Sequence, residues 1–242
     1  MASKRVIVEL RYTPELERHA TAGSAAAEST GIPGFTQDLS FAPVPLPALK
    51  GRLHSGNPRD TSALHALDDT LESRTYLVRG EMDDSTPVAE PSRTVVGVFA
   101  DVVMEPMLIC PRSPALGTHA DVERLLGVPR MPRCGMTGSG VLLAIVDGGV
   151  NLAHLTAKGK TPTFDSARSF STVPNVTPGS APVGHGTMCA FDACIAAPKC
   201  TLLDIAVLQA FNGTASGFAA LLSDVTRAYA HLQGVMAAPR RP

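Results

Sequence analysis

The sequence lacks a large excess of charge of either sign. Its 21 Lys and Arg residues stand against 22 Asp and Glu residues, which gives a formal net charge of −1 with histidine taken as neutral. Proteins that bind nucleic acid or an anionic membrane surface draw much of their affinity from clustered positive charge. The sequence therefore predicts neither nucleic acid nor a membrane as a partner.

A long uninterrupted run of apolar residues is also missing. No stretch approaches the roughly 20 apolar residues that a transmembrane helix needs. The N-terminal stretch MASKRVIVELRY starts with basic residues, but Glu9 and Arg11 interrupt its apolar run too early for a signal peptide. We therefore expect a cytoplasmic protein.

The cysteines lack the spacing of a disulfide framework or a metal site. They are five in number, an odd count, with no C-x-x-C pair, and we expect reduced thiols. Cys189 and Cys194 are five residues apart, which does not match the i, i+4 spacing of one helix face. The sequence thus predicts no metal and no cofactor. The full set is Cys110, Cys134, Cys189, Cys194 and Cys200.

With 44% hydrophobic residues, the chain can bury a sizeable core, and its pattern changes near residue 133. Before that point it has the strand-like stretches KRVIVELRY, TYLVRGEM and RTVVGVFADVVMEPMLIC and one short expected helix, THADVERLLGV. The stretch 19–49 is rich in alanine and proline. Its prolines favour extended polyproline geometry, and we expect the whole segment to be a loop or a weakly ordered insertion. We expect residues 1–133 to form a small α+β segment.

Residues 134–242 have the pattern of an α/β fold. The run from Val141 to Val146 is continuously apolar, as in a strand buried on both faces of a parallel sheet, and CTLLDIAVLQ is a second such strand. GTMCAFDACIAA between them predicts a helix that ends before Pro198. A second helix is expected from Ser216, its N-cap, to Gly234. This alternation predicts a parallel sheet with flanking helices.

Two residues lie where functional groups gather in open parallel sheets, at the carboxyl ends of strands. Asp147 follows the first apolar strand, and His185 opens the next helix, whose N-terminal dipole disfavours a charged imidazole. A neutral histidine can accept a proton, and an aspartate against its ring fixes the tautomer. Taken singly, Asp147 could be a turn former and His185 a helix cap. Their combination favours a catalytic pair.

The stretches LLAIVDGGVNLAHL and GHGTMCA resemble the aspartate and histidine boxes of the subtilisin-like serine proteases, the subtilases. In the family, the aspartate follows an apolar strand and precedes a small residue, Gly and Val, with a histidine soon after; here these are Asp147 to Val150 and His154. The second box, His-Gly-Thr and small residues, matches His185 to Thr187. APKCTLLDIAVLQ resembles the strand that follows. The resemblance covers roughly residues 137–233 and implies the N-terminal half of a subtilisin-like sheet.

The resemblance implies peptide-bond hydrolysis, with Asp147 as the orienting acid, His185 as the general base and a peptide or protein as substrate. Asn212, Gly213 and Thr214 lie where subtilases present an extended edge to the substrate backbone, so they are candidate peptide contacts, with an ordinary loop as the equal alternative. Residues 1–133 stand where the family often carries a pro-domain.

The family's serine nucleophile has no match here. Subtilases carry it in a Gly-Thr-Ser-x-Ala box well downstream of the histidine. In GTASGFAA the hydroxyl of Ser216 comes one position late, close after His185, and is explained as an N-cap. We therefore expect a truncated catalytic domain that is inactive alone. Three explanations stay open: a fragment of an active protease, half of a split enzyme completed by a second chain, and a pseudoprotease that binds peptides or a partner.

Two further expectations follow from the same residues. A half-sheet should expose an unpaired strand edge and apolar surface, which predicts association.

A nucleotide-binding protein is the competing functional class, but the glycines of TGSG precede the strand, and neither G-x-G-x-x-G nor G-x-x-x-x-G-K-[ST] occurs.

Overall fold

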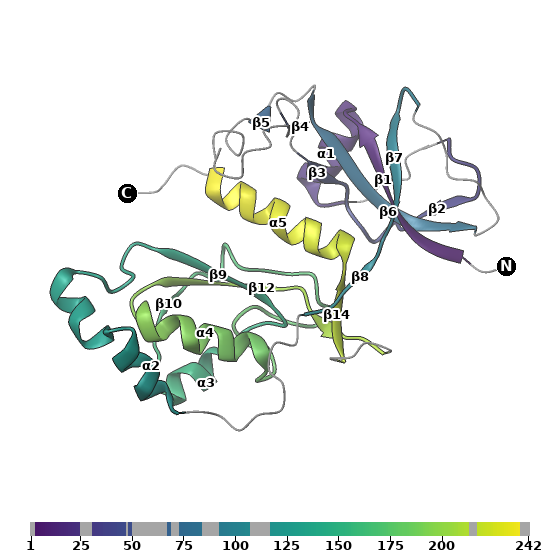
Figure 1. Cartoon of the computed structure of the whole chain (residues 1–242). Helices are drawn as coiled ribbons and strands as arrows, with labels where there is room; N and C mark the ends of the chain where they lie inside the picture. Colours follow the sequence, from purple (N-terminus) through teal and green to yellow (C-terminus); the bar gives the residue numbers. More distant parts are fainter. Residues whose placement is uncertain are drawn as a thin grey trace, which may run out of the picture. The chain divides into compact units, whose positions relative to one another are not determined.

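The computed structural model describes residues 3–24, 31–46, 48–49, 67–68, 73–83, 92–106, 117–212 and 217–237. The chain divides into two compact units, Met1–Val102 and Val103–Pro242 (Figure 1). The expected boundary after residue 133 assigns residues 117–133 to the first segment, whereas in the structure they fall within the second unit. None of the helices in these ranges combines the length and the apolar composition needed to cross a membrane.

The first unit is an antiparallel sheet with one helix. Its long strands are β1 (Ser3–Arg11), β6 (Thr75–Asp83) and β7 (Val95–Ala100), with β1 between the other two. Helix α1 (Pro14–Ala22) begins at Thr13, whose side chain accepts the N–H of Leu16, and ends at Gly23 with a φ of 62°. The strands expected at KRVIVELRY and TYLVRGEM are confirmed. Of the third expected stretch, RTVVGVFADVVMEPMLIC, Val95–Ala100 forms β7 of this sheet, Val103–Met104 forms a separate strand of the second unit, and residues 107–110 lie outside the described part of the chain.

Parts of the stretch 19–49 form regular elements that its composition did not suggest. It contains the end of α1 and the short strands β2 (Phe35–Gln37) and β3 (Val44–Leu46), both of which pair with β6. Strands β4 (Ala48–Leu49) and β5 (Leu67–Asp68) pair with each other. The expectation of a loop was wrong at these positions because pairing with a distant strand, and not local propensity, forms them.

The second unit is built on a parallel sheet. Strand β12 (Thr201–Ala206) pairs with β9 (Leu142–Asp147) along its whole length, and with β10 (Thr163–Phe164) and β11 (Phe170–Ser171) on its other edge. Helices α3 (Leu152–Ala157) and α4 (His185–Ala196) cover one face, and α5 (Leu222–Ala237) covers the other (Figure 1). This confirms a parallel sheet with flanking helices.

Smaller elements complete the second unit. The expected helix appears as α2 (His119–Leu125). It follows Thr118, whose N–H and hydroxyl both donate to the side chain of Asp121, and it precedes the 3-10 helix η3 (Val128–Cys134). Strand β14 (Phe218–Leu221) lies between β8 (Val103–Met104) and β13 (Gln209–Ala210) in an antiparallel sheet.

Strand β9 is not buried on both faces, contrary to the expectation from its apolar sequence. Leu143 and Ile145 pack on the side of α3 and α4, but Leu142 is 44% exposed and Ala144 is exposed. The reason is that α5 packs mainly over β12, at Leu203 and Ile205. Within the described part of the chain, β9 pairs with β12 alone.

The last helix begins later than expected. Phe218–Leu221 forms β14 instead of a first helical turn, and α5 continues past Gly234 to Ala237. Pairing of β14 with β8 and β13 buries Ala219 and Ala220 completely, which favours a strand over the helical alternative. Ser216, the expected N-cap, lies outside the described residues. Helix α4 ends at Ala196, two residues before Pro198, as expected.

Candidate active site

Asp147 is the last residue of β9 and lies at the carboxyl end of the sheet. It is 7% exposed, and its Oδ1 accepts the N–H of Gly148 at 2.7 Å. The chain then turns sharply at Gly149, whose φ of 102° favours glycine and where a Cβ would lie 2.6 Å from that of Ala181. The turn holds one carboxylate oxygen and leaves the other, Oδ2, available to a side chain.

His185 is the first residue of α4 and supplies that side chain. Its Nδ1 lies 2.7 Å from Oδ2 of Asp147. An ionised carboxylate only accepts hydrogen bonds, so against such a partner Nδ1 donates the hydrogen, and Nε2 of a neutral ring is then the acceptor. The histidine side chain is 64% exposed and that of Asp147 only 11%, so the acceptor nitrogen belongs to an accessible ring held by a buried acid.

The residues that follow His185 explain how α4 approaches the turn so closely. At Gly186, a Cβ would lie 2.6 Å from the carbonyl oxygen of Gly149 and 3.1 Å from Cβ of Asp147. Thr187, which is 2% exposed, accepts the N–H of Asn151 on its hydroxyl at 3.0 Å. Each residue of His-Gly-Thr therefore helps to fix the start of α4 against the loop after β9: the histidine contacts Asp147, the glycine permits the close approach, and the threonine accepts a backbone N–H of the loop.

A second carboxylate lies beneath this loop, and sequence reasoning missed it. Asp204 of β12 is fully buried, and its Oδ2 accepts the N–H groups of Gly179 at 2.7 Å and Val150 at 3.0 Å. Burial raises the pKa of Asp204, and the two hydrogen bonds offset only part of that effect. The signal in the sequence was a single acid inside the apolar run CTLLDIAVLQ.

Cys189 is the other residue near the pair that the sequence analysis did not connect with it. It lies one turn after His185, with Sγ 3.6 Å from Nδ1 and 3.9 Å from Nε2 of the histidine. Burial raises the pKa of the Cys189 thiol, and the charges of Asp147 and Asp192 add to this. The signal in the sequence is the i, i+4 spacing of His185 and Cys189.

The candidate peptide contacts are placed only in part. Asn212 follows strand β13, but Gly213 and Thr214 lie outside the described residues, so these two stay predictions. His154, the later histidine of the aspartate box, lies in α3, where its N–H donates to the side chain of the N-cap Asn151.

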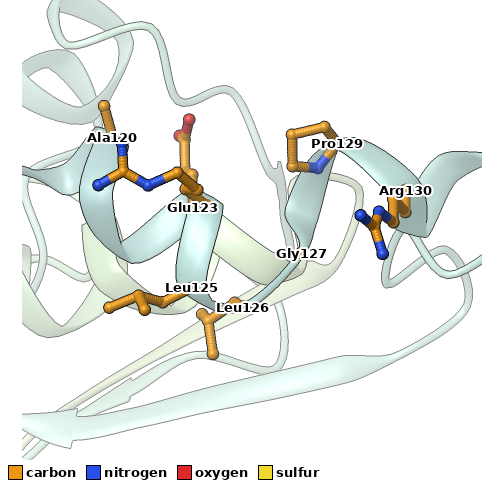
Figure 2. Close-up of a pocket in the computed structure, with 8 residues that line it drawn as sticks. Ala120, Glu123, Leu125, Leu126, Gly127, Pro129 and Arg130 are labelled. Atoms are coloured by element: carbon orange, nitrogen blue, oxygen red, sulfur yellow. The ribbon is translucent and has the colours of Figure 1, made fainter.

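The surface hollow shown in Figure 2 is separate from this site. It measures about 440 Å³ and is formed by α2 and the start of η3. Neither Asp147 nor His185 lines it, so the acid–base pair lies elsewhere on the second unit. The lining residues are Ala120, Glu123, Arg124, Leu125, Leu126, Gly127, Pro129 and Arg130.

Comparison of the chain with protein-family models, with curated proteins and with solved structures finds no match. The candidate active site therefore rests on the residues and the geometry of this chain.

Proposed function

We propose that Asp147 and His185 are the orienting acid and the general base of a subtilisin-like peptide hydrolase, whose serine nucleophile is not among these 242 residues. The observation that carries the proposal is the 2.7 Å contact between Nδ1 of His185 and Oδ2 of Asp147. It joins the carboxyl end of a parallel strand to the start of the next helix, where open α/β sheets place their functional groups.

The geometry supports a defined path for the proton. Nε2 of His185 takes the proton of the serine hydroxyl as the hydroxyl oxygen attacks the peptide carbonyl, and the same nitrogen gives it to the leaving amine. Asp147 keeps the ring in the required tautomer and stabilises the imidazolium formed in between. The exposed histidine side chain leaves Nε2 accessible to a serine from another segment or another chain.

The test is hydrolysis of a fluorogenic peptide by the complete polypeptide that the gene encodes. We expect His185→Ala to lower kcat by a factor on the order of 10⁴ to 10⁶, because the serine loses its base. His119→Ala is the matched control, since this histidine is exposed at the start of α2 in the same unit. Hydrolysis by His185→Ala at the wild-type rate contradicts the proposal.

A fluorophosphonate probe tests the nucleophile separately. We expect the 242-residue chain alone to remain unlabelled. Labelling that is abolished by Ser216→Ala would instead assign the nucleophile to Ser216.

Among the described residues β9 pairs with β12 alone, and its other edge supports a second candidate, a pseudoprotease or split half that binds a peptide or a partner chain in the cytoplasm. Leu142 of this strand and the preceding Val141 are 44% and 50% exposed. An apolar edge of this kind can accept an added strand. We expect Leu142→Lys to weaken such binding, measured by co-sedimentation with the partner half, while His185→Ala leaves it intact. Equal binding by wild type and Leu142→Lys would show that the edge of β9 is not the binding surface.

A further inference from the structure

Three different metal-ligating side chains meet at the candidate site. Single ligand atoms of Asp147, His185 and Cys189 all lie within 4.8 Å of one another. Oδ2 of Asp147 is 2.7 Å from Nδ1 of His185, and Sγ of Cys189 is 3.6 Å from the same nitrogen. A carboxylate, an imidazole and a thiol are the three ligand types that Zn²⁺ takes in proteins.

We propose that Asp147, His185 and Cys189 form a three-ligand site for Zn²⁺. Bond lengths of about 2.0 Å to nitrogen, 2.0–2.2 Å to oxygen and 2.3 Å to sulfur require tetrahedral ligand atoms to lie roughly 3.3–3.7 Å apart. The sulfur–nitrogen distance of 3.6 Å already fits this requirement. The oxygen and nitrogen must separate by roughly 0.6 Å as the ion takes the place of the shared proton.

Strand β9 and helix α4 hold the three ligands together at the carboxyl end of the parallel sheet. His185 is the first residue of α4 and Cys189 lies one turn further along, at i+4, so both project from the same helix face. Asp147 is oriented by the N–H of Gly148 on its Oδ1, which leaves Oδ2 for the ion. The close approach of α4 at Gly186 brings the helix to the strand end.

Charge and ligand softness favour zinc over the harder cations. The positive dipole at the start of α4 opposes a cation, but the carboxylate and a thiolate together supply two negative charges, which balance the charge of Zn²⁺. Mg²⁺ and Ca²⁺ prefer all-oxygen sites, so the thiolate discriminates against them. The exposed ring of His185 leaves room for water as the fourth ligand.

Zinc binding and proton transfer exclude each other at this site. An ion bound to Nδ1 displaces the hydrogen bond to Asp147, so His185 loses the acid that orients it. Zinc is therefore expected to inhibit hydrolysis. The inhibition rests on the proposed function, whereas the binding itself does not.

Titration of the tag-free, reduced chain with Co²⁺ and then Zn²⁺ tests the site. We expect one ion per chain, a thiolate-to-cobalt charge-transfer absorption, and displacement of Co²⁺ by Zn²⁺. Cys189→Ser should abolish the absorption and weaken Zn²⁺ binding at least about tenfold. Cys134→Ser, which changes an exposed cysteine of η3, is the matched control and should bind as wild type does. A cobalt complex of the wild-type chain without thiolate absorption overturns the proposal, whether or not the variants fold.

A hydrolysis assay with and without Zn²⁺ separates the two proposals. Zinc binding through Cys189 in a polypeptide that never hydrolyses peptides supports the metal site and contradicts the proposed function. Hydrolysis without any Zn²⁺ binding supports the function and overturns the metal site.

Discussion

Two carboxylates of the second unit have different surroundings and, on this account, different tasks. One oxygen of Asp147, Oδ1, accepts the N–H of Gly148, and the other, Oδ2, contacts Nδ1 of His185. The carboxylate is thus held with one oxygen directed at the imidazole ring. Asp204 is fully buried and accepts two backbone N–H groups of the loops around the site. The first orients a base, and the second holds the backbone that positions the first.

Replacement of Asp204 tests this second task. Asp204→Ala leaves the buried N–H groups of Val150 and Gly179 without an acceptor, and we expect a loss of about 3 kcal/mol in the free energy of unfolding. Asp204→Asn is the matched control, because its carbonyl oxygen can still accept both. Urea denaturation measures the difference, and equal losses in the two variants would contradict the assigned role.

The pH dependence of these variants has a defined sign. Burial raises the pKa of Asp204 in the folded state, so its stabilising contribution is complete below the ordinary carboxyl pKa and is lost as pH rises through the folded value. Asparagine does not ionise. The stability advantage of wild type over Asp204→Asn should therefore shrink as pH rises from about 4.

At the scale of secondary structure elements, the site depends on how closely α4 approaches the end of β9. Gly186→Ala places a Cβ 2.6 Å from the carbonyl oxygen of Gly149, so the start of α4 must move away. We expect a loss of about 1–3 kcal/mol in stability and a markedly lower kcat of the complete polypeptide.

Gly148→Ala is the control for this prediction, since its Cβ would meet only ordinary contacts from 3.5 Å outward. Thermal unfolding and the peptide assay compare the two variants. If Gly186→Ala behaves as Gly148→Ala does, the close approach of α4 has no role in the site.

The strands and helices that local sequence predicts best are those marked by a short-range pattern, even where their burial differs from the expectation. The runs at β9 and β12 and the start of α4 at His185 could be predicted, because an apolar run and a glycine-flanked helix start act locally. The exposure of Leu142 and the strand at Phe218–Leu221 could not, since both depend on which distant element covers or pairs with them.

The same distinction applies to the candidate site. Asp147 and His185 could be paired from the sequence because each directly marks the end or start of an element. Cys189 can be connected with His185 through their i, i+4 spacing, which the spacing of Cys189 from Cys194 does not reveal. Asp204 is recognised as a loop anchor only when Val150 and Gly179 are brought against it by the fold.

At the scale of the whole molecule, the proposed active site belongs to the second unit alone. Asp147, His185 and Cys189 all lie within Val103–Pro242, as do the loop anchors Thr187 and Asp204. The second unit also carries the exposed edge of β9. The proposed base, its proposed orienting acid and the exposed strand β9 therefore belong to one unit.

The most direct test of the central claim is the protonation state of the two ring nitrogens of His185, read by long-range ¹H–¹⁵N NMR of the metal-free chain at a pH where the ring is neutral. The account predicts hydrogen on Nδ1 and an unprotonated Nε2, with a downfield Nδ1–H resonance that Asp147→Ala removes. Hydrogen on Nε2 in the wild-type chain, unchanged by Asp147→Ala, would contradict the assignment of His185 as a base oriented by Asp147.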